Sequence, residues 1–189
     1  MIGLIQKVLT EVLDDQGGSA LVRAVFERAG EPYTAFRIDR NYSDAQCRAL
    51  LAAAAVELDL DEDAFCDLYA EGFIRRAEKL FPAFFQMAGN ARAFLARQPA
   101  IHGTMGAAIR DAYERREVED KFRVLANTAD GLIVEYGSPN RLCTLYAALA
   151  RRVARRYGES AHVIHEQCMR RGDDCCLMDV RFTKAEEAA

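Results

Sequence analysis

The spacing of hydrophobic residues changes once along the chain, near residue 120. Before that point they recur every three or four residues, as in amphipathic helices. After it, short runs rich in β-branched and aromatic residues are separated by turn residues, which is typical of strands. The first part predicts helices at 2–13, 19–26, 44–58, from about 61 onward, twice within 81–97 and at 99–113. The second part predicts strands at 122–128, 131–136, 161–168 and 175–182, with a long helix between 138 and 158.

Glycine, serine and proline residues mark where these elements begin and end. Gly17 and Gly18 end the first helix, and Ser43 has the side chain of a helix N-cap. Ser138 followed by Pro139 indicates the start of the long helix, with serine as the N-cap and proline in the first turn.

Helices that precede an antiparallel sheet in the chain predict an α+β fold. We expect an N-terminal helical layer packed on a C-terminal antiparallel sheet, with the long helix between the two hairpins. The 189 residues suit a single domain of roughly 100–200 residues. We assign residues 1–182 to this domain and residues 183–189 to a disordered tail.

Charge and hydropathy narrow the range of functions. The net charge is −4 with acidic and basic residues mixed, which argues against a nucleic-acid-binding surface. No apolar run approaches the ~18 residues that a membrane span requires, and the N-terminal segment is too polar for a signal peptide. We therefore expect a soluble, cytoplasmic protein without membrane insertion. We find no nucleophile paired with a base and no phosphate-binding glycine loop, so we do not expect an enzyme.

Four of the six cysteines lie in the last third of the chain, which points to metal or redox chemistry in a reducing compartment. His165 and Cys168 lie at one strand end, and with Cys143 and Cys176 they make a common tetrahedral zinc set. Cys175 and Cys176 face opposite sides of a strand, so only one of them can point inward. The alternative is a group of reduced, partly buried thiols beside a hairpin.

Three short motifs and the order of the elements resemble one known family. The chain begins MIGLI, residues 94–102 read FLARQPAIH, and residues 136–143 read YGSPNRLC. With the helices first and the sheet last, these features resemble the haem nitric oxide/oxygen-binding (H-NOX) domain in its bacterial stand-alone form. This sensor module is also found in soluble guanylate cyclases. The resemblance spans nearly the full chain and implies haem b as the cofactor.

The resemblance also implies which residues hold the haem. The histidine of FLARQPAIH, His102, takes the place of the axial iron ligand, and its apolar neighbours fit a porphyrin face. Tyr136 and Ser138 match residues that bind the haem propionates. The family's arginine position holds Asn140, and Arg141 follows one residue later, a rotation of ~100° on a helix. Both are candidates for the carboxylate site, where a guanidinium would bind best.

Each of these residues has a simpler interpretation as well. His102 can be a half-exposed helical histidine without a ligand. Ser138 can be a helix cap and nothing more, and Tyr136 an aromatic residue at the end of a strand.

The resemblance further implies a preference among gases. Members that bind dioxygen have a tyrosine where this chain has Leu145. Together with Ile5, Leu145 would form an apolar pocket that favours nitric oxide or carbon monoxide over dioxygen. The proline that distorts the haem in many members is missing from residues 113–124.

Zinc and a signalling partner complete what the resemblance implies. Some bacterial members carry a zinc site of three cysteines and one histidine, which Cys143, His165, Cys168 and Cys176 match. We expect no effector domain in this chain, and hence a partner in trans such as a histidine kinase or a cyclic-dinucleotide enzyme. The leading hypothesis is a haem-based nitric oxide sensor. Two alternatives stay open: a haem-free zinc or thiol redox module on the same fold, and a binding module for another apolar small molecule.

Overall fold

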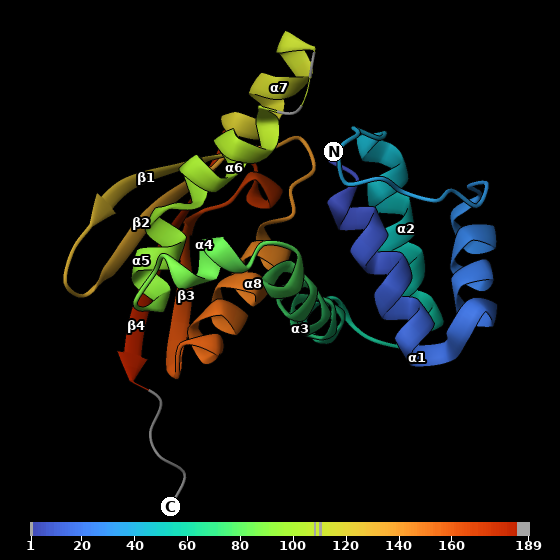
Figure 1. The fold of residues 1–189 in the computed structure, drawn as a ribbon, viewed down its shortest axis with the longest axis horizontal. Helices are drawn as coiled ribbons and strands as arrows, with labels where there is room; N and C mark the ends of the chain where they lie inside the picture. Colours follow the sequence, from blue (N-terminus) through green and yellow to red (C-terminus); the bar gives the residue numbers. More distant parts are fainter. Residues whose placement is uncertain (1, 108, 110, 185–189) are drawn as a thin grey trace, which may run out of the picture.

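The computed structural model describes residues 2–107, 109 and 111–184 (Figure 1). The first part is helical, with α1 (Leu4–Ala29), α2 (Asp44–Glu57), α3 (Glu62–Leu80), α4 (Pro82–Gln86), α5 (Ala91–Ala96), α6 (Gln98–Gly106) and α7 (Ala112–Glu119). The second part contains β1 (Phe122–Asn127), β2 (Gly131–Tyr136), α8 (Cys143–Arg156), β3 (Glu159–Gln167) and β4 (Cys176–Lys184). The predicted α+β fold, with N-terminal helices and a C-terminal antiparallel sheet, is confirmed.

Capping side chains begin several helices, and the cap at Ser43 is one that the sequence predicts. The Ser43 hydroxyl accepts a hydrogen bond from the Gln46 backbone N–H at 3.3 Å, and α2 starts at the next residue. Asn90 caps α5 in the same way, through the Ala93 N–H at 2.7 Å. The first helix bends at Gly17 and Gly18, where the backbone leaves helical geometry and Gly18 has a φ of 64°.

The predicted start of the long helix is wrong. Ser138 and Pro139 lie in a turn that the Arg141 N–H closes by donating to the Ser138 carbonyl at 3.0 Å. Arg141 has a left-handed φ of 51°, which a continuing helix cannot contain, so α8 begins only at Cys143. The Ser138 hydroxyl accepts from the Asn140 N–H at 3.4 Å, within the turn, and caps no helix.

Two further boundaries differ from the sequence prediction. The helix expected over residues 99–113 is two helices, because α6 ends at Gly106 and α7 begins at Ala112. β4 continues to Lys184, which lies past the predicted domain end at residue 182. The rest of the predicted tail, residues 185–189, lies outside the described residues.

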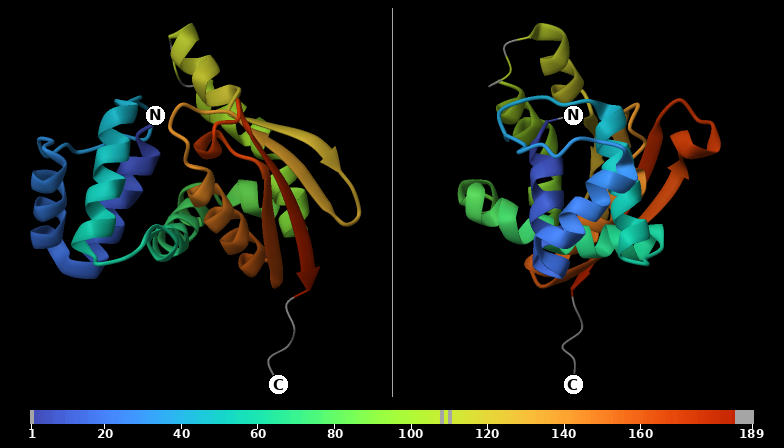
Figure 2. Two further views of the ribbon diagram at one scale, coloured as in Figure 1. Left: turned by 180° about the vertical axis from the view of Figure 1, so that it is seen from behind. Right: turned by 90° about the vertical axis from the view of Figure 1, so that its right-hand side faces the viewer.

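The sheet has the strand order β1-β2-β4-β3, and every pair is antiparallel. In the middle pair, Tyr136 at the end of β2 lies opposite Cys176 at the start of β4. The views in Figures 1 and 2 agree that α1 and α2 form one side of the molecule and the sheet the other, with α3 and α8 between them. Among the described residues, no helix is both long enough and apolar enough to cross a membrane.

Helix α8 contributes to two hydrophobic clusters. Leu145 and Ala148 join the cluster formed by α1, α2 and α3. Tyr146, Ala150 and Val153 join the cluster formed by the sheet with α4 and α5. The two faces of one helix thus hold both halves of the domain together.

Candidate functional site

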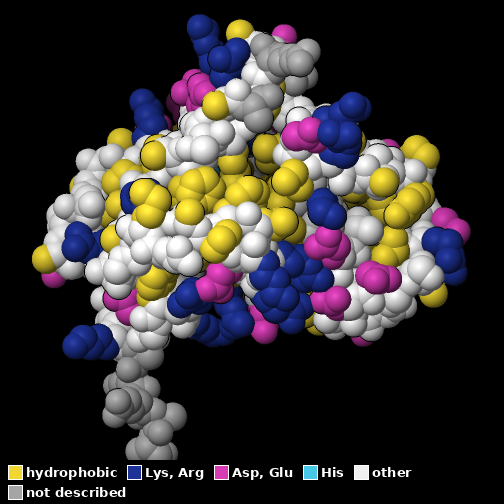
Figure 3. All heavy atoms as spheres, viewed as in Figure 1, with side chains coloured by type: hydrophobic (Ala, Val, Ile, Leu, Met, Phe, Trp, Pro, Cys, Tyr) yellow, Lys and Arg dark blue, Asp and Glu magenta, His cyan; other side chains and the backbone are white. Residues whose placement is uncertain are grey.

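A cavity of about 170 Å³ lies at the junction of the two hydrophobic clusters. Its walls come from α1, α3 to α8 and the first two strands, and most of the lining side chains are apolar. Figure 3 shows hydrophobic side chains gathered in a band on this face, between the level of α6 and that of α3 and α4. Apolar cavities of this kind accept largely apolar ligands.

The imidazole of His102 projects from α6 into the wall of this cavity. Its Nδ1 is buried without a hydrogen-bond partner, and the ring is hydrogen-bonded to the backbone of Val118. The ring of Phe122 packs beside it, with 4.8 Å between ring centroids. Burial lowers the pKa of His102 to about 4, and the nearby charge of Lys121 acts in the same direction. The imidazole is therefore neutral near pH 7, with one nitrogen available as a donor ligand.

Two more polar atoms of the cavity lining are buried without a partner. They are the Oε1 of Gln98 and the hydroxyl of Tyr146. An unsatisfied buried polar atom costs ~1–3 kcal/mol. Three such atoms around one apolar cavity indicate that the cavity is built for an occupant with polar or metal-binding groups.

Tyr136 and Ser138 form a hydrogen-bonded pair at the cavity wall. The Tyr136 hydroxyl accepts from the Leu142 N–H at 3.2 Å and is also hydrogen-bonded to Ser138. Burial raises the pKa of Tyr136 to about 12, so it stays a neutral hydroxyl. Both side chains are buried, and the Tyr136 ring lines the cavity.

Asn140 and Arg141 point to different surroundings. Asn140 is 2% exposed, and its Oδ1 accepts a hydrogen bond from Nη1 of Arg48 at 3.0 Å. Arg141 is exposed and does not line the cavity. No local sequence pattern indicates Arg48, because it lies on α2, 92 positions from Asn140.

Ile5 and Leu145 both line the cavity, as expected of an apolar gas-binding pocket. Ile5 belongs to α1 and Leu145 to α8, so the two residues come from different layers of the fold. The buried hydroxyl of Tyr69 on α3 donates to the Ile5 carbonyl at 2.9 Å and fixes this part of α1.

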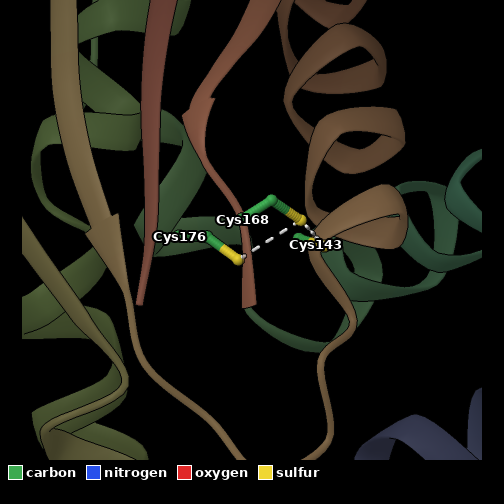
Figure 4. Close-up of side chains that lie close together, drawn as sticks. All are labelled: Cys143, Cys168 and Cys176. Carbon is green, nitrogen blue, oxygen red and sulfur yellow. Dashed lines mark hydrogen bonds between the residues drawn. The ribbon is translucent and has the colours of Figure 1, made fainter. Parts of the chain in front are cut away.

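Three of the four predicted zinc ligands lie together. The sulfur atoms of Cys143, Cys168 and Cys176 lie within 4.8 Å of one another, and all three residues are buried (Figure 4). The Cys143 and Cys168 sulfurs are 3.5 Å apart, and those of Cys168 and Cys176 are 4.0 Å apart. Figure 4 shows the side chains converging from α8, from the end of β3 and from β4.

In this cluster the pKa of Cys168 is lowered, whereas burial raises the pKa values of Cys143 and Cys176. The Met169 N–H donates to the Cys176 sulfur at 3.3 Å. Burial tends to raise the pKa of Cys168, but hydrogen bonds from the Arg170 backbone and the neighbouring thiols outweigh it, so the pKa lies below its usual value. By contrast, burial raises the pKa of Cys143 to about 12, and its contact with Cys168 adds to the effect.

His165 is not among the atoms that the structure groups at the cluster. It pairs with Met178 across β3 and β4, two residues from Cys176, so the two side chains share one face of the sheet. Its Nδ1 is buried without a partner. Cys175 is half-buried, and its sulfur is 4.0 Å from the Gln167 side-chain oxygen.

Comparisons with known proteins point to one family. The chain matches the Haem-NO-binding family over residues 2–165. Its structure is similar to that of an H-NOX protein from S. oneidensis in the Fe(II)NO state, with a TM-score of 0.74, 16% identity, and coverage of 97% of this chain and 100% of that chain. It is also similar to an oxygen-binding H-NOX domain related to soluble guanylate cyclases, in its oxygen complex, with a TM-score of 0.75 and 16% identity over 100% and 99% of the two chains.

A third similar structure is an unliganded Fe(II) H-NOX protein from K. algicida, with a TM-score of 0.72 and 18% identity over 100% of both chains. No match was found among curated proteins. At identities of 16–18%, the similarity to these structures shows the fold alone. The family is shown by the match over residues 2–165, which is most of the chain.

The lowered pKa of the half-buried His102 imidazole predicts a pH-dependent stability of the haem-free protein. The pKa of His102 is about 4 in the folded protein against 6.5 for the unperturbed group, so between these values the unfolded chain binds more protons. The free energy of unfolding should be greatest above pH 6.5 and should fall by about 3 kcal/mol as the pH drops to 4. Urea denaturation of the wild type and of His102→Phe across this interval measures the contribution, as the difference between the two slopes. His162→Gln, at an exposed strand position, serves as the control; equal slopes in the wild type and His102→Phe would contradict the prediction.

Proposed function

The chain belongs to the Haem-NO-binding family, and on that premise we propose that it is a haem-based sensor of nitric oxide that signals to a separate protein. H-NOX domains are haem sensor domains without an enzymatic activity of their own. The observation that carries the proposal is that His102 lines an apolar cavity and that its buried Nδ1 has no hydrogen-bond partner. A neutral imidazole in such surroundings is a standard axial donor for haem iron.

The residues present fit haem b in three respects. Phenylalanine side chains of α3, α4, α5 and β1 give the flat apolar walls that a porphyrin ring requires. His102 gives the axial donor, and Phe122 holds its ring from one side. Lys121 and the Tyr136–Ser138 pair give a cation and hydroxyls for acidic groups at the cavity wall. Haem itself supplies the iron at which a diatomic gas binds.

The preference for nitric oxide or carbon monoxide over dioxygen is supported by Ile5 and Leu145. Both line the cavity and neither carries a hydrogen-bond donor on its side chain. Stable dioxygen binding by haem proteins depends on the polarity and hydrogen-bond donors of the pocket. An apolar pocket offers no hydrogen-bond donor to stabilise bound dioxygen.

Helix α6 is the element that would carry a signal. His102 contacts Phe122 in the cluster around the sheet, while Met105, one turn further along α6, packs against the cluster of α1, α2 and α3. A movement of His102 would therefore bias the packing of one cluster against the other, which is how a local change becomes a change of state. A partner in trans, such as a histidine kinase or a cyclic-dinucleotide enzyme, is part of the proposal, and so is a cytoplasmic location.

We also propose zinc at the cluster of Cys143, Cys168 and Cys176. The specific support is that three buried sulfurs converge and that the Met169 N–H donates to one of them. Three thiolates and one imidazole form a common structural zinc site. His165 is the fourth ligand in this proposal, because its side chain shares a sheet face with Cys176 and its Nδ1 has no partner.

The axial role of His102 predicts that haem binding depends on this side chain. We expect the reconstituted protein to show an intense Soret band, and His102→Gly to lose most of it and to regain it when imidazole is added to fill the vacated space. Absorption spectroscopy during haem titration measures both effects, with His162→Gln as the matched control. Wild-type haem binding that survives in His102→Gly without imidazole would contradict the assignment.

The apolar pocket predicts a specific effect of a new hydroxyl group. In the ferrous wild type, we expect nitric oxide and carbon monoxide to change the absorption spectrum, and dioxygen to give no persistent change. Leu145→Tyr should create measurable dioxygen affinity, because its hydroxyl can donate a hydrogen bond. Leu145→Phe adds a similar ring without the hydroxyl and should not. Equal dioxygen affinity in the two variants, or stable dioxygen binding by the wild type, would argue against the pocket as described.

The cysteine cluster predicts which thiol matters for metal content. We expect about one zinc per chain in the purified protein and much less in Cys168→Ser and Cys176→Ser. Cys175→Ser should keep its zinc, because the Cys175 sulfur lies apart from the cluster. This variant is the matched control for Cys176→Ser, since the two residues are adjacent in the sequence. Elemental analysis measures the content, and His165→Asn tests the fourth ligand. The site is refuted if the wild type lacks zinc under reducing conditions. It is also refuted if Cys175→Ser and Cys176→Ser lose zinc to the same extent.

A further inference from the structure

We propose that Arg48, on α2, supplies the guanidinium that binds a haem carboxylate in this protein. The inference rests on the proposed haem binding. It assigns a role to a residue outside residues 136–143, the segment expected from the sequence to bind the haem carboxylates. The position where the resemblance implies an arginine is occupied by Asn140, whose side chain is a neutral amide. The oxygen of that amide accepts a hydrogen bond from Arg48.

A chain of hydrogen bonds connects Arg48 to the cavity. Nη1 of Arg48 donates to Oδ1 of Asn140 at 3.0 Å, and Asn140 is almost fully buried. Nδ2 of Asn140 lies 3.5 Å from the Ser138 hydroxyl, which is in turn hydrogen-bonded to the Tyr136 hydroxyl on the cavity wall. The guanidinium is thus oriented by the same turn that presents the two hydroxyls.

The charges in this region fit a ligand with two acidic groups. Haem b carries two carboxylates, and Lys121 on the cavity wall is one cation for them. Arg48 is a second, and its contact with Asn140 uses one of five N–H donors, which leaves the paired geometry that suits a carboxylate. Asp44, one turn before Arg48 on α2, is a carboxylate of the protein near Lys121. Burial tends to raise its pKa, but neighbours that include Asn140 and Lys121 lower it.

The arginine of the segment itself, Arg141, has a left-handed backbone. The side chains of Arg141 and Arg48 are both exposed, and neither is part of the cavity lining. Arg48 is the one that is hydrogen-bonded to Asn140. An amide at position 140 accepts a hydrogen bond from Arg48, whereas an arginine there would repel it. In this proposal only one of positions 48 and 140 carries an arginine. Here that arginine is at position 48, on α2, and the turn carries the amide that binds it.

The test compares haem with haem dimethyl ester, in which both carboxylates are blocked. The rate at which each porphyrin leaves the protein is measured by transfer to excess apomyoglobin. For Arg48→Ala we expect haem to dissociate about tenfold faster than from the wild type, as for the loss of one charge-assisted pair, with no change for the ester. Arg28→Ala removes a comparable exposed arginine that pairs with Glu57 of α2, and it should change neither rate.

Two further variants separate ligand binding from a structural role. Arg48→Gln keeps an amide that can donate to Asn140 but removes the charge, so it should behave like Arg48→Ala toward haem even if the alanine variant is unstable. Adding Asn140→Arg to Arg48→Ala should restore slow haem dissociation. Thermal unfolding of the haem-free variants reports any loss of stability separately.

The proposal is overturned if Arg48→Ala and Arg48→Gln leave the haem rate unchanged. It is equally overturned if they accelerate haem and ester alike, which would show that Arg48 only braces α2 against the turn. If the wild type binds neither porphyrin, the proposed haem function itself fails, and that result is distinct from the other two.

Discussion

A buried imidazole nitrogen without a hydrogen-bond partner is the feature on which the rest of this structure depends. Leaving His102 Nδ1 unpaired costs free energy unless the site receives an electron-pair acceptor. The apolar surroundings keep the ring neutral, and a neutral ring is the form that can coordinate a metal. Phe122 and the Val118 backbone hold the ring in place. Burial, protonation and orientation therefore all suit the metal-binding role that we propose for this imidazole.

The cavity and the cysteine cluster are joined by one short segment. Tyr136, on the cavity wall, lies opposite Cys176 in the sheet, and Cys143 begins the helix that carries Leu145 into the cavity. Cys143 and Cys176 also contribute to the raised pKa of Tyr136, which is due mainly to burial. In our proposal, metal at the sulfurs fixes the start of α8 and so supports the carboxylate end of the haem site. Loss of that metal would then also disturb the cavity wall formed by this segment.

Local patterns were enough to predict much of the fold and part of the site. Helical periodicity and the cap at Ser43 identified helices correctly. The family resemblance named His102, Tyr136 and Ser138, and the spacing of the cysteines named the three whose sulfurs lie together. The start of α8 could not, because Ser138 and Pro139 form a normal helix start in sequence. Only the left-handed backbone of Arg141 shows that a turn intervenes.

The missed residues depend on tertiary contacts. Arg48 reaches Asn140 across 92 positions, and Lys121 and Gln98 gain their place only when α6 and β1 enclose the cavity. The unpaired hydroxyl of Tyr146 depends on which face of α8 meets the sheet. Pairing between strands likewise decides where His165 lies, and it places that residue diagonally from Cys176 instead of inside the sulfur cluster.

The most direct test of the central claim is resonance Raman spectroscopy of the ferrous, haem-reconstituted protein without added gas. The protein is prepared with natural-abundance histidine and with histidine labelled with heavy nitrogen. If the His102 imidazole is the axial donor, an iron–histidine stretching band is present, shifts to lower frequency on labelling, and is lost in a variant without this side chain. A band that is absent from the wild type, or one that does not respond to the label, would contradict the account.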